Sequence, residues 1–130
     1  MRSRNAILEA LEVFRELHSG ITLTNMMTFL YVCENEGLTL LDLASVSDLY
    51  LATASRTIRA FLAPDAEAAL YPALNLVRIV PTPRGKTVCL SDAGRAFRDL
   101  LDEIISAAHP IRTAAERSSG ADVSVRAAHA

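Results

Sequence analysis

The sequence predicts a mainly α-helical (α+β) fold, and three observations support this prediction. Of the 130 residues 51% are hydrophobic, yet there is no Trp and only 5% are aromatic. The core must therefore be built from aliphatic side chains, which suits packed helices. Apolar residues recur at helical spacing over most of the chain, and two strand-like runs within residues 76–90 favour one β-hairpin.

Composition and length exclude several classes of protein. The apolar content is too high for general disorder, and 130 residues suffice for one domain with a core. No uncharged run approaches the roughly 20 residues that cross a bilayer. The N-terminus, Met1–Asn5, leads into a charged pattern and lacks the apolar core of a secretory signal. We expect a cytoplasmic protein without a membrane partner.

The residue types that carry catalysis or bind metals are sparse. Cys33 and Cys89 are isolated, without CxxC spacing, and no basic residue lies near Cys33 in sequence, so we interpret both as structural, Cys33 as a small buried hydrophobe. None of His18, His109 and His129 has a carboxylate at metal-ligand spacing. A glycine-rich phosphate loop is absent from the sequence. We expect no catalytic residue, metal or cofactor, and hence no enzyme.

The segment 51–62 predicts a helix with two different faces. One sector is apolar and the opposite sector is small or basic. The apolar set is Ala54, Ile58, Phe61 and Leu62, and the opposite set is Ala52, Arg56, Arg59 and Ala60. Upstream lies a second short apolar run, residues 40–44, followed by a polar turn at residues 45–48. Two short helices joined by a tight turn are the pattern of a helix-turn-helix, whose second helix is the recognition helix.

A predicted hairpin follows this pair of helices. Its strands are Leu76–Val80 and Thr87–Leu90, and the turn between them, residues 81–86, carries Arg84 and Lys86. Residues 90–95 then open a long helix.

This order of elements resembles the winged-helix regulators of the MarR family, over roughly residues 21–108. Thr53-Ala54-Ser55-Arg56 matches the core of that family's recognition helix, and Leu90-Ser91-Asp92-Ala93-Gly94 matches the element that closes its hairpin. The resemblance implies a homodimer that places the recognition helix 52–62 in the major groove of double-stranded DNA. It also implies that the wing, residues 81–87, meets the minor groove or the backbone, and it allows a small-molecule effector.

The remaining elements complete the prediction. Residues 4–18 form an amphipathic helix that packs either across a two-fold axis, as in the family, or on its own domain. A second helix runs from Thr22 or Thr24 to about Asn35, with Met26, Met27, Leu30 and Cys33 inward, where the methionines fill the core or line an effector pocket. Residues 64–70 form one short helical turn. A helix begins after Ser91 as N-cap and runs to about residue 108.

The predicted domain is therefore residues 1–112, a winged helix-turn-helix domain with terminal dimerisation helices and a DNA-binding core at residues 39–91. Residues 113–130 form a partly disordered tail.

The charge distribution supports a DNA partner even though the net charge is −2. Residues 51–86 carry five basic and two acidic side chains, a formal charge of +3, whereas residues 1–50 carry −4 and residues 87–130 carry −1. The local sign decides whether a surface can approach phosphates.

We predict a DNA-binding transcriptional regulator, with contacts from seven residues: Thr53, Ser55, Arg56, Thr57, Arg59, Arg84 and Lys86. A basic helix face is often only a solvated surface. Here the short preceding helix, the small neighbouring residues and the basic hairpin favour DNA. The alternative is a winged-helix protein-interaction module that has lost DNA binding.

Overall fold

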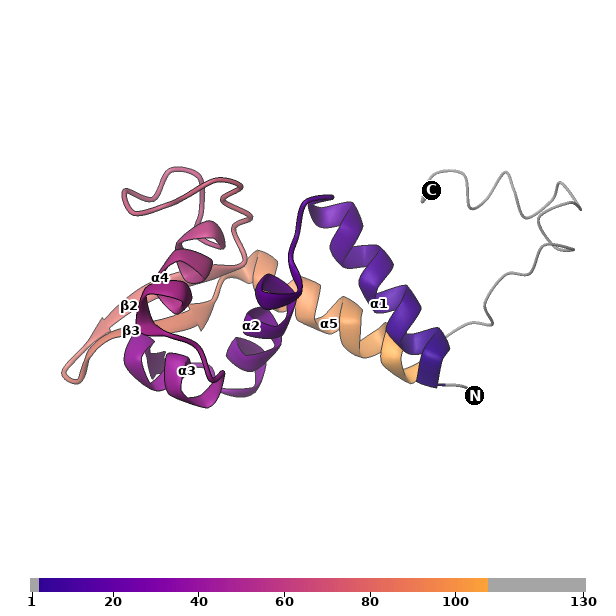
Figure 1. Cartoon of the computed structure of the whole chain (residues 1–130), viewed down its shortest axis with the longest axis horizontal. Coiled ribbons are helices and arrows are strands. Elements are labelled where there is room, and N and C mark those ends of the chain that lie inside the picture. Colours follow the sequence, from indigo (N-terminus) through magenta and orange to yellow (C-terminus); the bar gives the residue numbers. More distant parts are fainter. Residues whose placement is uncertain (1–2, 108–130) are drawn as a thin grey trace, which may run out of the picture. The chain divides into compact units, whose positions relative to one another are not determined.

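The computed structural model of the chain describes residues 3–107 and divides them into two compact units. Residues 20–100 form the core unit, and residues 3–19 with 101–107 form the terminal unit. The elements in chain order are α1 (Ser3–Leu17), α2 (Leu23–Glu34), β1 (Leu38–Thr39), α3 (Leu40–Val46), α4 (Leu51–Ala60), β2 (Val77–Thr82), β3 (Gly85–Leu90) and α5 (Asp92–Ser106), as Figure 1 shows. The predicted fold class, helices with a small antiparallel sheet, is confirmed.

Hydroxyl side chains begin three helices of the core unit. The Thr22 hydroxyl accepts from the N–H of Asn25, whose side chain accepts from the N–H of Thr22, forming a capping box. The Thr39 hydroxyl accepts from the N–H of Asp42 at the start of α3. At the start of α5 the Ser91 hydroxyl accepts from the N–H of Gly94 at 2.9 Å, as predicted for this N-cap.

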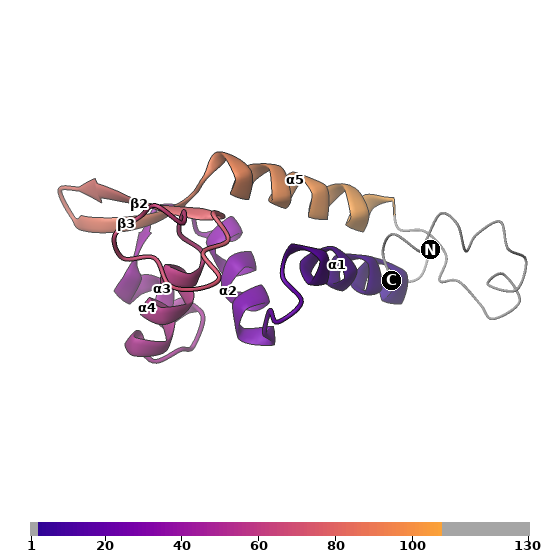
Figure 2. The same cartoon turned by 90° about the horizontal axis from the view of Figure 1, so that it is seen from above.

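The sheet has the strand order β1-β3-β2, and both pairs are antiparallel. In the hairpin Thr82 pairs with Gly85, so the turn is tighter than the predicted one. Gly85 has a φ of 113°, a left-handed conformation that favours glycine. The two-residue strand β1, which pairs Leu38 with Val88, was not predicted. Figures 1 and 2 show the hairpin projecting from the core unit beside α4.

The centre of the core unit is aromatic despite the low aromatic content. The ring of Phe29 on α2 lies 6.1 Å from the ring of Phe61 and 5.6 Å from that of Phe97, between centroids. Val32, Leu43, Ile58, Leu76 and Leu90 of the same unit are also buried. These contacts tie α2, α4 and the start of α5 into one core.

The predicted inward face of α2 was partly wrong. Thr28, Phe29 and Val32 are buried, whereas Met27 and Leu30 are exposed. Helix α2 is apolar on almost all sides, so its periodicity did not distinguish the two faces.

The segment 63–75 forms successive turns and not the predicted helical turn. Its N–H groups are used elsewhere: those of Leu70 and Leu74 donate to the carbonyls of Arg59 and Ala60, at 2.9 and 3.0 Å. The segment therefore returns to the end of α4, as the trace in Figure 2 shows.

Gly94 is required where α5 begins. A Cβ at this position would collide with the backbone carbonyl of Leu76. The same carbonyl accepts from the N–H of Ser91, whose hydroxyl donates to the carbonyl of Asn75 at 2.7 Å. The first turn of α5 is thus fixed directly against the end of the segment 63–75.

In the terminal unit the predicted boundaries of α1 are confirmed to within one residue. Phe14 and Leu101 are buried, but Ile7, Leu8, Leu11 and Ile105 are exposed. Helix α5 ends at Ser106, two residues before its predicted end near residue 108. The predicted tail at 113–130 lies outside the described residues, as do His109 and His129. None of the helices that the structure describes is long and apolar enough to cross a membrane.

Candidate nucleic-acid interface

Helix α4 has one buried and one exposed side, as its sequence predicts. Ala54, Thr57 and Ile58 are buried, and Ala52 and Arg56 are exposed. Between these two sides Thr53 and Ser55 are half-buried. The exposed side therefore presents small residues around one arginine, so a partner can approach the helix backbone closely.

Thr57 lies on the buried side of α4, unlike the other predicted site residues on this helix. Its side chain is only 6% exposed, and its hydroxyl donates to the carbonyl of Thr53 at 2.8 Å. A hydroxyl that bonds within its own helix is not presented to an outside partner.

Arg59 is half-buried because the segment 63–75 meets it. Its Nε donates to the carbonyl of Ala68 at 2.7 Å. Arg56, one turn earlier, is exposed and makes no such bond within residues 3–107. The two arginines look equivalent in the sequence, but in the structure Arg59 is held by a hydrogen bond and Arg56 is exposed to solvent.

In the structure the wing is the whole β2–β3 hairpin, residues 77–90, which is longer than the predicted 81–87 and holds its two predicted cations at its tip. Arg84 and Lys86 are both exposed. The Thr82 hydroxyl donates to the carbonyl of Gly85 at 2.8 Å and accepts from the N–H of Arg84 at 3.2 Å, which fixes the turn. Midway along the wing the Thr87 hydroxyl donates to the carbonyl of Val80.

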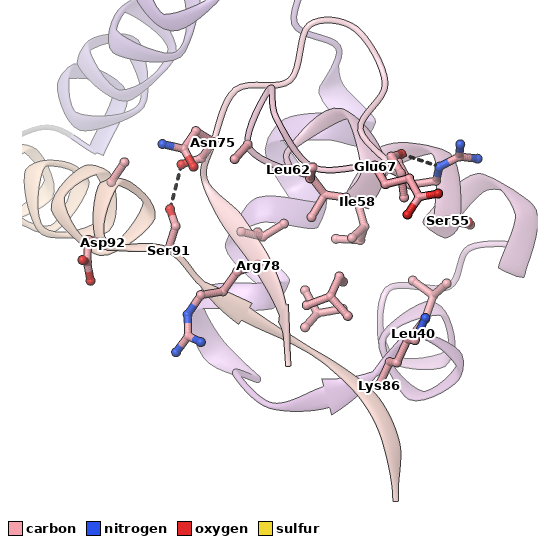
Figure 3. A pocket seen from close by; sticks show the side chains of 18 of the residues that line it. Leu40, Ser55, Ile58, Leu62, Glu67, Asn75, Arg78, Lys86, Ser91 and Asp92 are labelled. Atoms are coloured by element: carbon pink, nitrogen blue, oxygen red, sulfur yellow. Dashed lines mark hydrogen bonds between the residues drawn. The ribbon is translucent and has the colours of Figure 1, made fainter. Parts of the chain in front are cut away.

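An open groove of about 990 Å³ lies between α4, the segment 63–75 and the wing (Figure 3). Its apolar lining includes Ile58, Leu62 and Val88, and it is also lined by Ser55 of α4 and Lys86 of the wing. The lining of the groove also includes four cations, Arg59, Arg78, Lys86 and Arg95, and two acidic residues, Glu67 and Asp92. Three of the predicted site residues, Ser55, Arg59 and Lys86, thus line one groove.

Sequence analysis missed Arg78 as a member of this group. It lies on β2 and its Nε donates to the carbonyl of Leu90 at 3.3 Å. The signal was present in the sequence, because Arg78 interrupts an otherwise apolar strand.

Sequence analysis also missed the N-terminal end of α4. Tyr50 is 85% exposed and Leu51 is 50% exposed. Tyr50 occupies the N-cap position but makes no side-chain cap hydrogen bond. Two large side chains of apolar character therefore lie exposed beside Ala52 at the start of the helix.

The two cysteines lie outside this group of residues. Both are free thiols and half-buried, so Cys33 is less buried than predicted. The pKa of Arg98 on α5 is raised, first by its hydrogen bond to Asp99 and then by the charge of that carboxylate. Within residues 3–107 no three His, Cys, Asp or Glu side chains gather as a metal site requires.

Comparison with known proteins places this geometry in a fold family. No protein-family model matches the sequence, and no curated protein sequence matches it. The structure of RV1404 from Mycobacterium tuberculosis superposes with a TM-score of 0.60 at 15% sequence identity, covering 96% of this chain and 86% of that chain. The structure of disulfide-formed AbfR gives a TM-score of 0.52 at 18% identity, covering 95% and 87%.

A third structure, Bordetella bronchiseptica BpsR in a study of how 6-hydroxynicotinic acid regulates its DNA binding, gives a TM-score of 0.47 at 17% identity, covering 98% and 90%. The likeness of fold rests on the first two structures, whose TM-scores exceed 0.5. This likeness agrees with the order of elements described above, a helix-turn-helix, a hairpin and a long terminal helix. The chain has a MarR-like winged helix-turn-helix fold.

Proposed function

We propose that this protein is a cytoplasmic DNA-binding transcriptional regulator that inserts α4 into the major groove. The observation that carries the proposal is the exposed side of α4, where Arg56 stands among small residues next to a wing with two exposed cations. Small side chains allow the helix backbone to approach the bases, and arginine binds guanine edges in a bidentate manner. The formal charge of +3 on residues 51–86 favours phosphates.

The structure supports a division of roles among the contact residues. Thr53, Ser55 and Arg56 lie on or beside the exposed side of α4 and are assigned to base edges or neighbouring phosphates. Arg84 and Lys86 at the wing tip are assigned to the minor groove or the backbone. Arg59 is assigned to a phosphate at the groove between α4 and the wing, and Thr57 to the stability of α4.

We further propose that the protein acts as a homodimer. Ile7 and Leu11 of α1 and Ile105 of α5 are large aliphatic residues that remain exposed in the terminal unit. Exposed apolar residues on two helices favour burial against a second copy. A two-fold dimer would bind a pseudo-palindrome with half-sites about one helical turn apart.

The proposal is tested by selecting duplexes from a random library with the full-length protein and measuring affinity by fluorescence polarisation. The selected duplexes should bind at least about 10³-fold more tightly than scrambled ones. Affinity should fall linearly with salt on logarithmic axes, because bound phosphates release counterions. Equal binding of selected and scrambled duplexes, or no binding at low salt, would instead favour the protein-interaction module.

A further inference from the structure

The N-terminal end of α4 exposes apolar surface that the core unit does not use. Leu51 is half exposed, and the preceding Tyr50 is one of the most exposed large hydrophobic residues of the described chain at 85%. The buried side of the same helix is already filled by Ala54, Thr57 and Ile58. Packing within residues 3–107 therefore does not account for Leu51 or Tyr50.

The N-cap of α4 also departs from local rules. Thr22, Thr39 and Ser91 cap α2, α3 and α5 with their hydroxyls, whereas Tyr50 makes no cap hydrogen bond. Tyrosine is not among the residues that cap helices well. Positions where a protein violates a local rule that it follows elsewhere are often functional ones.

We infer that Leu51, with the ring of Tyr50 before it, contacts the 5-methyl group of thymine in the major groove. This inference rests on the proposed function and assigns a sequence preference to the same surface. The first residues of a recognition helix are those that contact base edges. The major-groove edges of the bases present hydrogen-bond donors and acceptors, and the thymine methyl is the apolar group among them.

The position of Leu51 on the helix agrees with this contact. Residues four apart lie on the same side of a helix, so Leu51 lies one turn before Ser55, which lines the groove between α4 and the wing. Arg56 follows on the exposed side. Arg56 is five residues after Leu51 and lies about 140° from it around the helix, so the two side chains predict separate contacts, with thymine and with guanine, within each half-site.

The test removes only the methyl group from the DNA. Each thymine of a selected duplex is replaced singly by deoxyuridine, which pairs identically but lacks the 5-methyl. We expect about a fourfold loss of affinity at one or two thymines per half-site, the effect of one buried methyl. The other thymines should tolerate the change.

Two variants assign the methyl contact to its side chain. Leu51→Ala should bind the thymine and deoxyuridine duplexes with equal affinity. Leu23→Ala, which truncates a leucine that is 66% exposed on α2, should keep the full preference for thymine. Because the readout is a ratio of affinities for two duplexes, a general loss of affinity or a changed dimer does not mimic it.

The outcomes separate this inference from the function on which it rests. Sequence-specific binding without any effect of deoxyuridine would overturn the thymine contact and leave the regulator intact. A thymine preference that survives in Leu51→Ala would overturn the assignment to Leu51. Absence of sequence-specific binding in the parent would overturn both, and would assign the apolar end of α4 to a protein partner.

Discussion

The two ends of helix α4 differ in how the rest of the chain holds them. At the C-terminal end the carbonyls of Arg59 to Leu62 accept N–H groups from the segment that follows, and Arg59 itself bonds to Ala68. At the N-terminal end Tyr50 provides no cap hydrogen bond and remains almost fully exposed. The C-terminal end of α4 therefore fixes the orientation of the helix, while the N-terminal end is available to a partner.

The segment 63–75 holds the C-terminal end through unusual backbone geometry. Ala73 and Asn75 have φ values of 52° and 59°, in the left-handed region, which is unfavourable for alanine. These conformations aim the N–H groups of Leu74 and Asn75 at Ala60 and Leu62. The protein thus accepts local strain where the helix is held.

The largest effect is expected from Gly94→Ala on α5. This change disturbs Leu76, whose N–H donates to the carbonyl of Phe61 at the C-terminal end of α4. The added Cβ would collide with the carbonyl of Leu76, which cannot move freely because it accepts from Ser91. We expect a loss of about 3 kcal/mol in the free energy of unfolding, measured by urea denaturation. Ala96→Ser, an exposed change on α5, should cost less than about 0.5 kcal/mol. Equal free energies of unfolding for the two variants would show that the close contact between α5 and Leu76 does not contribute to stability.

A smaller effect is expected from Arg59→Ala. This change removes the bond to Ala68, and a hydrogen bond of this kind contributes about 1 kcal/mol to the free energy of unfolding. Arg56→Ala should leave that free energy within about 0.5 kcal/mol of the parent, because Arg56 is exposed. Denaturation of both variants compares them directly. A stability loss in Arg56→Ala as large as that in Arg59→Ala would contradict the distinction between the two arginines.

A side chain that caps the N-terminal end of α4 should stabilise the protein. Tyr50→Ser supplies a hydroxyl for the first turn of α4 and should raise the free energy of unfolding by about 0.5 to 1 kcal/mol. Tyr50→Ala removes the same ring without a cap and serves as the control, with little expected change. A stable Tyr50→Ser variant with weaker DNA binding would show that the poor cap is kept for function. If both variants lose stability equally, the ring has a structural role.

Much of the core unit followed from sequence periodicity. The recurrence of apolar residues at helical spacing predicted α4 and the helices around it. The strand-like apolar runs within residues 76–90 predicted the wing. Periodicity failed for α2, where apolar residues on nearly all sides left Met27 and Leu30 on the wrong face. It also failed for the segment 63–75, because hydrogen bonds to α4 determine that conformation and such bonds leave no local pattern.

The candidate interface was predictable in part. Arg56, Arg84 and Lys86 lie exposed where helical spacing and the hairpin predicted them. Thr57 was placed outside because a small polar residue at the boundary of a helix face carries no signal of its bond to Thr53. Tyr50 and Leu51 escaped notice because large apolar residues are ordinarily assigned to a core.

The most direct test of the central claim, that the exposed side of α4 contacts bases while the wing contacts backbone, compares Arg56→Ala with Lys86→Ala over a salt series. Specific and scrambled duplexes are titrated with each full-length variant, as dimers if the parent dimerises. Arg56→Ala should weaken specific binding by about 1 to 3 kcal/mol and relax preference at one operator position. Lys86→Ala should weaken binding to all duplexes similarly and make the salt slope shallower by about one. Unchanged affinity of both variants at every salt concentration would contradict the assignment of α4 as a recognition helix.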